Sequence, residues 1–76
     1  MGHRGSTLHR LTIRLNGEPA DFPAPLTIVA LLASLDVDPR RVAVELNGHV
    51  VKRARFEESI LQDGDEVEIV NFVGGG

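Results

Sequence analysis

Cysteine, tryptophan and tyrosine are absent from this chain of 76 residues, and three phenylalanines are its only aromatic side chains. A chain without cysteine can form no disulfide and perform no thiol chemistry of its own, and its composition suits a reducing compartment. The scarcity of aromatic rings removes the stacking platforms on which nucleic-acid bases lie. The net charge of −3 provides no basic face for phosphate groups. We therefore expect no nucleic-acid partner.

Long hydrophobic runs are also missing. No apolar segment approaches the roughly 20 residues that a transmembrane helix needs, and Met1 to Arg10 lack the apolar segment of a signal peptide. These absences predict a cytoplasmic protein with no membrane partner. At 42% hydrophobic and 25% charged residues, the composition is ordinary for a globular domain. The length suffices for one small domain, which buries only about 60% of the surface that its unfolded chain exposes.

The chain divides into three parts. The segment from Met1 to Thr7 is polar and glycine-rich and has no hydrophobic periodicity. We interpret residues 1–10 as a flexible N-terminal extension or a remnant of expression cloning. Residues 11–73 form the predicted domain, and residues 74–76 form a flexible glycine tail.

A first β-hairpin is predicted at Asn16-Gly17, because both positions of such a pair tolerate the positive φ angles of a tight turn. Apolar and polar residues alternate over residues 11–15, which is typical of a half-buried strand. The returning strand, residues 18–22, contains Pro19, which lacks an N–H to donate. We therefore expect this strand at an edge of the sheet.

One helix is expected after the first hairpin. Thr27 is a good N-cap, since its hydroxyl can accept a hydrogen bond from the first turn. An apolar stripe then recurs at helical spacing over about ten residues. Its members are Ile28, Leu31, Leu32 and Leu35. The helix is expected to end over residues 36–39, because the residue before a proline is pushed out of the helical region.

A second hairpin and a last strand complete the predicted sheet. Asn47-Gly48 joins the strands predicted over residues 42–46 and 50–53. The turn Asp63-Gly64-Asp65 precedes a strand over residues 66–73. The connection between them is polar, with three apolar residues expected to anchor it to the core. These are Phe56, Ile60 and Leu61. The element order predicts an α+β domain with a mixed sheet and a helix on one face.

Alternation in the last strand separates two faces. Val67, Ile69 and Val73 are predicted to share one face, and Val70 and Phe72 to share the other. If the helix covers the first face, Val70 and Phe72 are left exposed beside the tail. Adjacent exposed apolar residues form a candidate surface for docking a partner.

The chain ends in three glycines and a carboxylate. Glycine has no Cβ, so residues 74–76 can adopt almost any backbone angle and present very little width. We interpret the end of the chain as a thin, flexible arm that extends from a rigid strand. Frayed termini also collect small residues, so the tail alone does not establish this interpretation.

The histidine and serine residues of the sequence indicate neither catalysis nor metal binding. His3, His9 and His49 lack the spacing of metal ligands. Ser34 and Ser59 have no partner base in a plausible pocket. We predict no catalytic residue and no metal site.

Four segments of the chain together resemble one family. They are Val42-Ala43-Val44-Glu45-Leu46-Asn47-Gly48, Val51-Lys52-Arg53, Asp63-Gly64-Asp65-Glu66-Val67-Glu68-Ile69 and Phe72-Val73-Gly74-Gly75-Gly76. In order and spacing, the chain from Leu11 onward is similar to the ThiS family, the sulfur-carrier proteins of thiamine biosynthesis. Family members often carry proline where this chain has Lys52, and residues 1–10 have no counterpart in the family pattern. The resemblance implies the ubiquitin-like β-grasp fold, with four to five strands and one main helix.

The resemblance also implies that the chain is a substrate of enzymes and not an enzyme. A ThiF-like adenylyltransferase would use ATP and Mg to convert the Gly76 carboxylate into an acyl-adenylate. Sulfur from cysteine, delivered by a cysteine desulfurase or another donor, would displace AMP and leave a thiocarboxylate. A ThiG-like thiazole synthase would take this sulfur into the thiazole ring of thiamine. Gly74 and Gly75 would thread into the partners' active sites, and the chain itself would bind no cofactor.

Three alternatives remain open at the level of sequence. The first is another sulfur carrier of the same fold, such as the small subunit of molybdopterin synthase. The second is a ubiquitin-like modifier whose terminal glycine joins target lysines. The third is a non-covalent interaction module in which the tail is dispensable.

Overall fold

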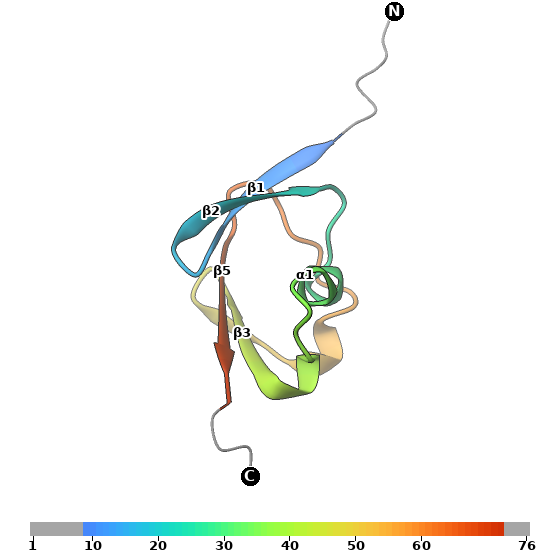
Figure 1. The fold of residues 1–76 in the computed structure, drawn as a ribbon, viewed down its shortest axis with the longest axis vertical. Coiled ribbons are helices and arrows are strands. Elements are labelled where there is room, and N and C mark those ends of the chain that lie inside the picture. Colours follow the sequence, from blue (N-terminus) through green and yellow to red (C-terminus); the bar gives the residue numbers. More distant parts are fainter. Residues whose placement is uncertain (1–8, 73–76) are drawn as a thin grey trace, which may run out of the picture.

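The computed structural model describes residues 9–72, which form a five-stranded mixed sheet with one α-helix. The elements are β1 (Arg10–Leu15), β2 (Glu18–Pro23), α1 (Ile28–Ser34), the 3-10 turn η1 (Pro39–Arg41), β3 (Val42–Leu46), β4 (His49–Val51), the 3-10 turn η2 (Arg53–Arg55) and β5 (Glu66–Asn71). The strand order is β2-β1-β5-β3-β4. The β1–β5 pair is parallel, and the other neighbouring pairs are antiparallel. The sheet curves around α1, and β5 occupies its centre (Figure 1).

Both predicted hairpins are confirmed, and their turns have nearly the same geometry. The returning strand of the second was predicted over residues 50–53, but β4 is His49–Val51, because the chain turns into η2 at Arg53. Asn16 and Gly17 have φ angles of 51° and 87°, and Asn47 and Gly48 have φ angles of 52° and 86°. Positive φ at both central residues is the type I′ turn, whose twist matches that of the strands it joins. The two Asn-Gly pairs therefore fix the registers of β1 with β2 and of β3 with β4.

The position of β2 agrees with the prediction from Pro19, since β2 is an edge strand. On the other side of the hairpin, β1 begins at Arg10, one residue before the expected start. Arg10 lies opposite Pro23, and the Ala24 N–H donates to the His9 carbonyl at 2.8 Å. The ordered ladder thus reaches slightly into the segment assigned to the N-terminal extension.

Helix α1 begins as predicted but ends early. The Thr27 hydroxyl accepts a hydrogen bond from the Ala30 N–H at 3.1 Å, which is the expected N-cap. The helix has seven residues and not about ten. After Leu35, Asp36 adopts a φ of 60°. The Asp36 N–H donates to the Ala33 carbonyl and the Val37 N–H to the Leu32 carbonyl, which together form a Schellman motif.

This early ending changes the predicted apolar stripe. Ile28, Leu31 and Leu32 are fully buried, whereas Leu35 caps the helix and is 38% exposed. The sequence signalled the end only through Pro39. The stop itself comes from an aspartate in the left-handed region, a position that glycine usually holds.

The core lies between α1 and the face of the sheet that it covers. Its buried residues are Leu11, Ile13, Leu26, Ile28, Leu31, Leu32, Val42, Val44, Phe56, Leu61 and Val67. The connection from β4 to β5 is anchored by Phe56 and Leu61, as predicted. The prediction that Ile60 is a third anchor is wrong, because its side chain is 55% exposed. Residues 60 and 61 are extended and alternate, so Leu61 points inward and Ile60 outward.

The last strand is shorter than predicted, since β5 ends at Asn71. Its two faces are those expected: Val67 is fully buried and Ile69 is half-buried, while Val70 and Phe72 are exposed. Val73 lies outside the described residues. Within residues 9–72, the structure contains no helix with the length and apolar character needed to cross a membrane.

Candidate docking site at the C-terminal strand

The C-terminal half of β5 extends past the hairpin of β1. Pairing with β1 covers only Arg14–Glu66 and Leu15–Val67. Pairing with β3 continues along β5 to Asn71, which lies opposite Val42. The Phe72 N–H donates to the Arg41 carbonyl at 2.8 Å, so the ladder with β3 continues one residue beyond the strand. The chain is therefore held in a fixed direction up to Phe72.

Two asparagine side chains hold β5 from opposite sides. The side-chain Oδ1 of Asn47 accepts from the backbone N–H of Glu66 at 2.9 Å. The backbone N–H of Asn47 donates to the Glu66 carbonyl at 2.7 Å. On the other side, the Asn16 amide binds both backbone groups of Ile69. The sequence predicted these asparagines only as turn residues. The periodicity of β5 contains no signal for their bonds to it, because the bonds depend on how the two hairpins are placed in the sheet.

The predicted docking residues lie on the face of the sheet opposite α1. Val70 is 57% exposed and Phe72 is 59% exposed. Val70 lies directly opposite Ala43 of β3. On the next strand, Val50 lies opposite Glu45 and is 69% exposed. The exposure that a docking role requires is present, and the role itself stays a prediction.

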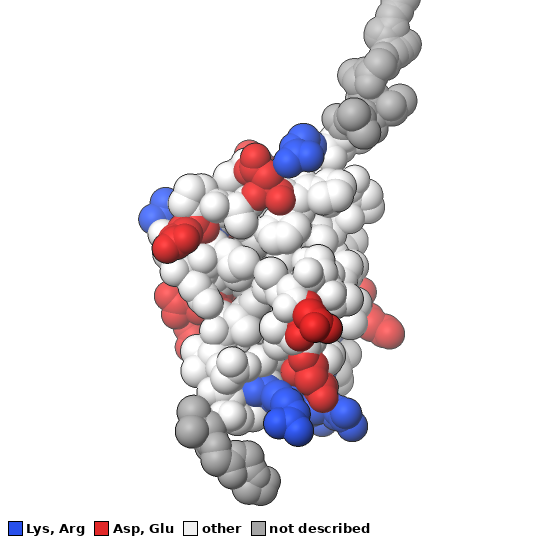
Figure 2. Space-filling view, viewed as in Figure 1, with Lys and Arg blue, Asp and Glu red and all other residues white. Residues whose placement is uncertain are grey.

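The turn η1 packs against the end of β5 through the Phe72–Arg41 bond. Asp38 caps this turn: its Oδ1 accepts from the Arg40 N–H at 2.9 Å, and its Oδ2 lies 3.1 Å from the Arg40 Nη2. The Arg41 Nε lies 3.9 Å from the same carboxylate. The hydrogen bond from the Arg40 side chain, followed by that from the Arg40 N–H, lowers the pKa of Asp38. Basic side chains gather at the end of the molecule where β5 ends (Figure 2).

The glycines predicted to form the working arm are not among the described residues. Gly74, Gly75 and Gly76 follow Phe72 and Val73 in the sequence, and their roles stay predictions. The structure does bring Val70 and Phe72 to the base of this segment. Within residues 9–72, no group of three or more histidine, cysteine, aspartate or glutamate residues could hold a metal ion.

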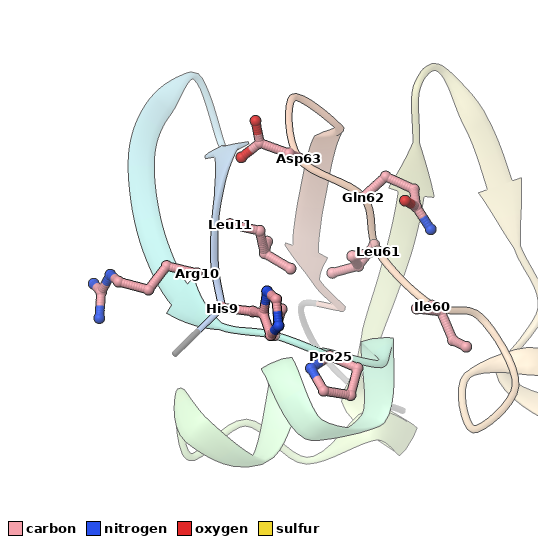
Figure 3. Close-up of a pocket in the computed structure, with 9 residues that line it drawn as sticks. His9, Arg10, Leu11, Pro25, Ile60, Leu61, Gln62 and Asp63 are labelled. Carbon is pink, nitrogen blue, oxygen red and sulfur yellow. The ribbon is translucent and has the colours of Figure 1, made fainter. Parts of the chain in front are cut away.

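A hollow at the opposite end of the molecule contains none of the predicted site residues. It lies between the start of β1 and the segment before β5, and is lined by residues that include His9, Arg10, Ile60 and Gln62 (Figure 3). Because β1 runs parallel to β5, the start of β1 is far from the end of β5. The hollow therefore adds nothing to the site at the C-terminal strand.

Comparisons with known proteins place the chain in a family. The model of the ThiS family matches residues 13–76. The sulfur carrier protein ThiS of Bacillus subtilis is 40% identical over 65 residues, which are 84% of this chain and 98% of that protein. A crystal structure of the thiamine biosynthesis protein ThiS from Geobacter metallireducens is 38% identical, with a TM-score of 0.75. The match covers 87% of this chain and 100% of the Geobacter metallireducens chain.

Two further relatives are much longer than this chain. A thiazole synthase of Paramagnetospirillum magneticum is 47% identical over 62 residues, which are 82% of this chain and 19% of that protein. A thiazole synthase of Magnetococcus marinus is 44% identical over 66 residues, 87% of this chain and 20% of that protein. The chain thus spans about a fifth of these two relatives. The five-stranded sheet with one helix matches the solved ThiS structure and confirms the predicted β-grasp fold. On its fold and on a family match that runs from β1 to Gly76, this chain belongs to the ThiS family.

Proposed function

We propose that the chain is a sulfur carrier of thiamine biosynthesis whose reacting group is its own C-terminal carboxylate. In this function the chain is consumed and regenerated by enzymes and is not a catalyst itself. The proposal is supported by membership of the ThiS family and by the name of the Bacillus subtilis relative. It does not depend on any side chain with catalytic chemistry.

The first step activates the carboxylate of Gly76. This group is ionised at neutral pH, since the pKa of a terminal carboxyl is about 3.5, and it is a poor acylating agent. An adenylyltransferase of the ThiF type would catalyse attack of a carboxylate oxygen on the α-phosphate of ATP, with Mg as its metal. Pyrophosphate leaves, and the glycine is held as an acyl-adenylate whose AMP is a good leaving group.

The second step exchanges oxygen for sulfur. A sulfur nucleophile, derived from cysteine by a desulfurase, attacks the acyl carbon and expels AMP. If that nucleophile is a persulfide, its attack leaves an acyl disulfide. A thiol then attacks the sulfur that belongs to the persulfide donor, which breaks the S–S bond, forms a mixed disulfide with the donor and leaves Gly76 as a thiocarboxylate. Thiazole synthase would transfer this sulfur to its substrate, and as the acyl C–S bond breaks, an oxygen atom from that substrate or from water would take the place of sulfur and return the chain as a carboxylate.

The structural observation that best supports this function is the continuity between β5 and the end of the chain. β5 is the central strand, and hydrogen bonds hold it up to Phe72. Gly76 lies four residues beyond Phe72, and three of those four residues are glycine. Four residues can span at most about 14 Å. A partner that acts on Gly76 must therefore bring its active site close to Val70 and Phe72.

Thiazole synthase is the partner best supported by the comparisons. A segment similar to this chain forms about a fifth of two proteins that bear that name. A carrier joined covalently to the enzyme that uses its sulfur would be present at a high effective concentration. We propose that the separate chain meets the same enzyme by docking.

Intact-protein mass spectrometry tests the function directly. The chain is incubated with ATP, Mg, the adenylyltransferase, a cysteine desulfurase, cysteine and a thiol reductant. We expect a mass gain that corresponds to exchange of one oxygen for one sulfur, localised to Gly76 by fragmentation. A variant that lacks Gly76 is the matched control and should not change in mass. An unchanged wild-type mass under conditions that convert the Bacillus subtilis protein would contradict the proposal.

A further inference from the structure

We propose that the sheet face opposite α1 is a polarised docking surface for thiazole synthase, apolar beside the tail and acidic farther from it. We infer that the enzyme presents an apolar patch at the mouth of its active site and basic side chains beyond that patch. The inference rests on the proposed function, since it takes thiazole synthase as the partner. It adds the chemistry of the contact and the orientation in which the tail is presented.

The apolar part of this docking surface lies next to the point where the tail begins. Val70 and Phe72 share this face because they alternate with the inward-facing Val67 and Ile69. Ala43 lies directly opposite Val70 and continues the patch onto β3. This valine and this phenylalanine, two residues apart at the end of β5, expose apolar surface to water. Burial of that surface by the apolar surface of a partner would be favourable.

The acidic part begins two residue pairs farther along the same two strands, at the next pair that lies on this face. Glu45 of β3 lies directly opposite Glu68 of β5. The alternation that exposes Val70 puts both glutamates on the docking surface. No ion pair among the described residues includes either of them. Like charges directly opposite each other on neighbouring strands destabilise a sheet. The folded chain therefore carries a repulsion that a partner's cation would relieve.

A small hollow beside Glu68 offers a place for such a cation. It is lined by Arg14, Gly17, Glu66, Val67 and Glu68. The Arg14 guanidinium is already engaged, since its Nη2 donates to the Gly17 carbonyl at 2.9 Å and its Nε lies 3.8 Å from a Glu66 oxygen. Arg14 is thus the one arginine that lines this hollow, together with two carboxylates, those of Glu66 and Glu68, and Glu45 lies opposite Glu68. A lysine or arginine of the partner would complete the charge balance there.

The order of the two parts along β5 gives the contact a direction. The apolar pair adjoins the tail and the carboxylates lie behind it, so only one orientation of the chain matches a partner that is apolar at its mouth and basic beyond. Like-charge contacts penalise the wrong orientation. The same charges disfavour a second copy of this chain as the occupant, because a symmetric contact would bring acidic faces together.

Binding to purified thiazole synthase tests the surface without any sulfur chemistry. The full-length chain, with its ordinary carboxylate, is titrated into the enzyme and the dissociation constant is measured at low and high salt. We expect the affinity to fall with salt, and Glu68→Lys to weaken binding by about tenfold or more. Glu57→Lys is the matched control, because it makes the same charge change on an exposed residue in the connection after η2. It should leave the dissociation constant nearly unchanged.

A second readout separates docking from folding. Glu68→Lys places a cation opposite Glu45, so the variant should unfold at the same or a higher urea concentration than wild type while it binds more weakly. Val70→Asp should also weaken binding, which tests the apolar part. Equal affinities of wild type, Glu68→Lys and Val70→Asp for thiazole synthase would overturn the docking proposal. The proposal would also be overturned if Glu68→Lys weakened binding only to the adenylyltransferase and not to thiazole synthase. Equal losses of affinity for thiazole synthase in Glu68→Lys and Glu57→Lys would overturn it as well.

The experiments distinguish an error in the docking proposal from an error in the proposed carrier function. If wild type binds thiazole synthase and forms the thiocarboxylate but the charge variants bind normally, the docking proposal is wrong and the carrier function stands. If wild type does not bind the enzyme at all, the docking proposal is overturned. The mass of Gly76 after incubation with the activating enzymes then decides the carrier function independently.

Discussion

The side-chain amide of Asn16 pairs with both backbone groups of Ile69, although the two residues are 53 positions apart in the sequence. The Asn16 Oδ1 accepts from the Ile69 N–H at 2.8 Å, and its Nδ2 lies 3.4 Å from the Ile69 carbonyl. The amide thus takes the place of a strand residue where β1 has already turned away. It prolongs the pairing of β5 toward the tail.

Replacing Asn16 with glycine should loosen β5 at this point. Glycine accepts the φ of 51° at this position, so the turn is kept and only the amide is lost. We expect a loss of about 1 kcal/mol in the free energy of unfolding. Hydrogen exchange at the Ile69 N–H should also become faster. The N–H of residue 16, which donates to the Val67 carbonyl in wild type, is the internal control and should stay protected. Unchanged protection of Ile69 would show that the amide contributes little.

Helix α1 offers a comparison between two leucines of one predicted stripe. Leu31→Ala empties a fully buried site and should cost about 2–5 kcal/mol. A domain of this size has a total stability of roughly 4–11 kcal/mol, so this loss is large. Leu35→Ala changes a residue that is partly exposed at the helix end, and it should cost less than about 1 kcal/mol. Urea unfolding measures both. Similar costs would contradict the early end of the helix.

Several features of the fold could be predicted because short sequence patterns determine them. The two Asn-Gly pairs specify type I′ turns through their backbone preferences, and Pro19 excludes its strand from the interior of the sheet. The faces of β5 follow from strict alternation. In each case the physical cause lies within a few residues of the pattern.

Other features depend on contacts that no local pattern contains. Asp36 ends α1 early because the Schellman bonds form around it, and aspartate is a rarer choice there than glycine. Ile60 is exposed because Leu61 takes the inward position, and the sequence does not distinguish the two. The opposition of Glu45 and Glu68 requires the register between β3 and β5, which is known only once the sheet is assembled.

The carboxylate of Asp38 should titrate below its usual value of 3.8, because the Arg40 side chain and N–H donate to its charged form. A pKa that is lower in the folded chain gives stability that is present above the unfolded pKa. That stability is lost as the pH falls through the folded pKa. Arg40→Gln should move the pKa of Asp38 upward, as measured by NMR of the carboxyl carbon. Arg41→Gln removes a more distant charge and should move it less. Equal shifts in the two variants would contradict this assignment.

The last prediction concerns the width of the tail. Gly75→Ala adds one methyl group in a segment that must enter the adenylyltransferase if Gly76 is to be activated. We expect a slower rate of adenylation, measured as ATP–pyrophosphate exchange, because a side chain widens the arm and restricts its backbone. The urea midpoint should be unchanged, since the core is formed by residues from Leu11 to Val67.

Gly5→Ala is the matched control for this variant, because it adds the same methyl group near the N-terminus and should leave both measurements unchanged. Normal pyrophosphate exchange by Gly75→Ala would show that the enzyme does not require a slender arm at residue 75. A changed urea midpoint would instead show that residue 75 contributes to folding. The second result would contradict the separation between a folded body that ends near Phe72 and a reactive arm beyond it, and the first would contradict the requirement for a narrow arm.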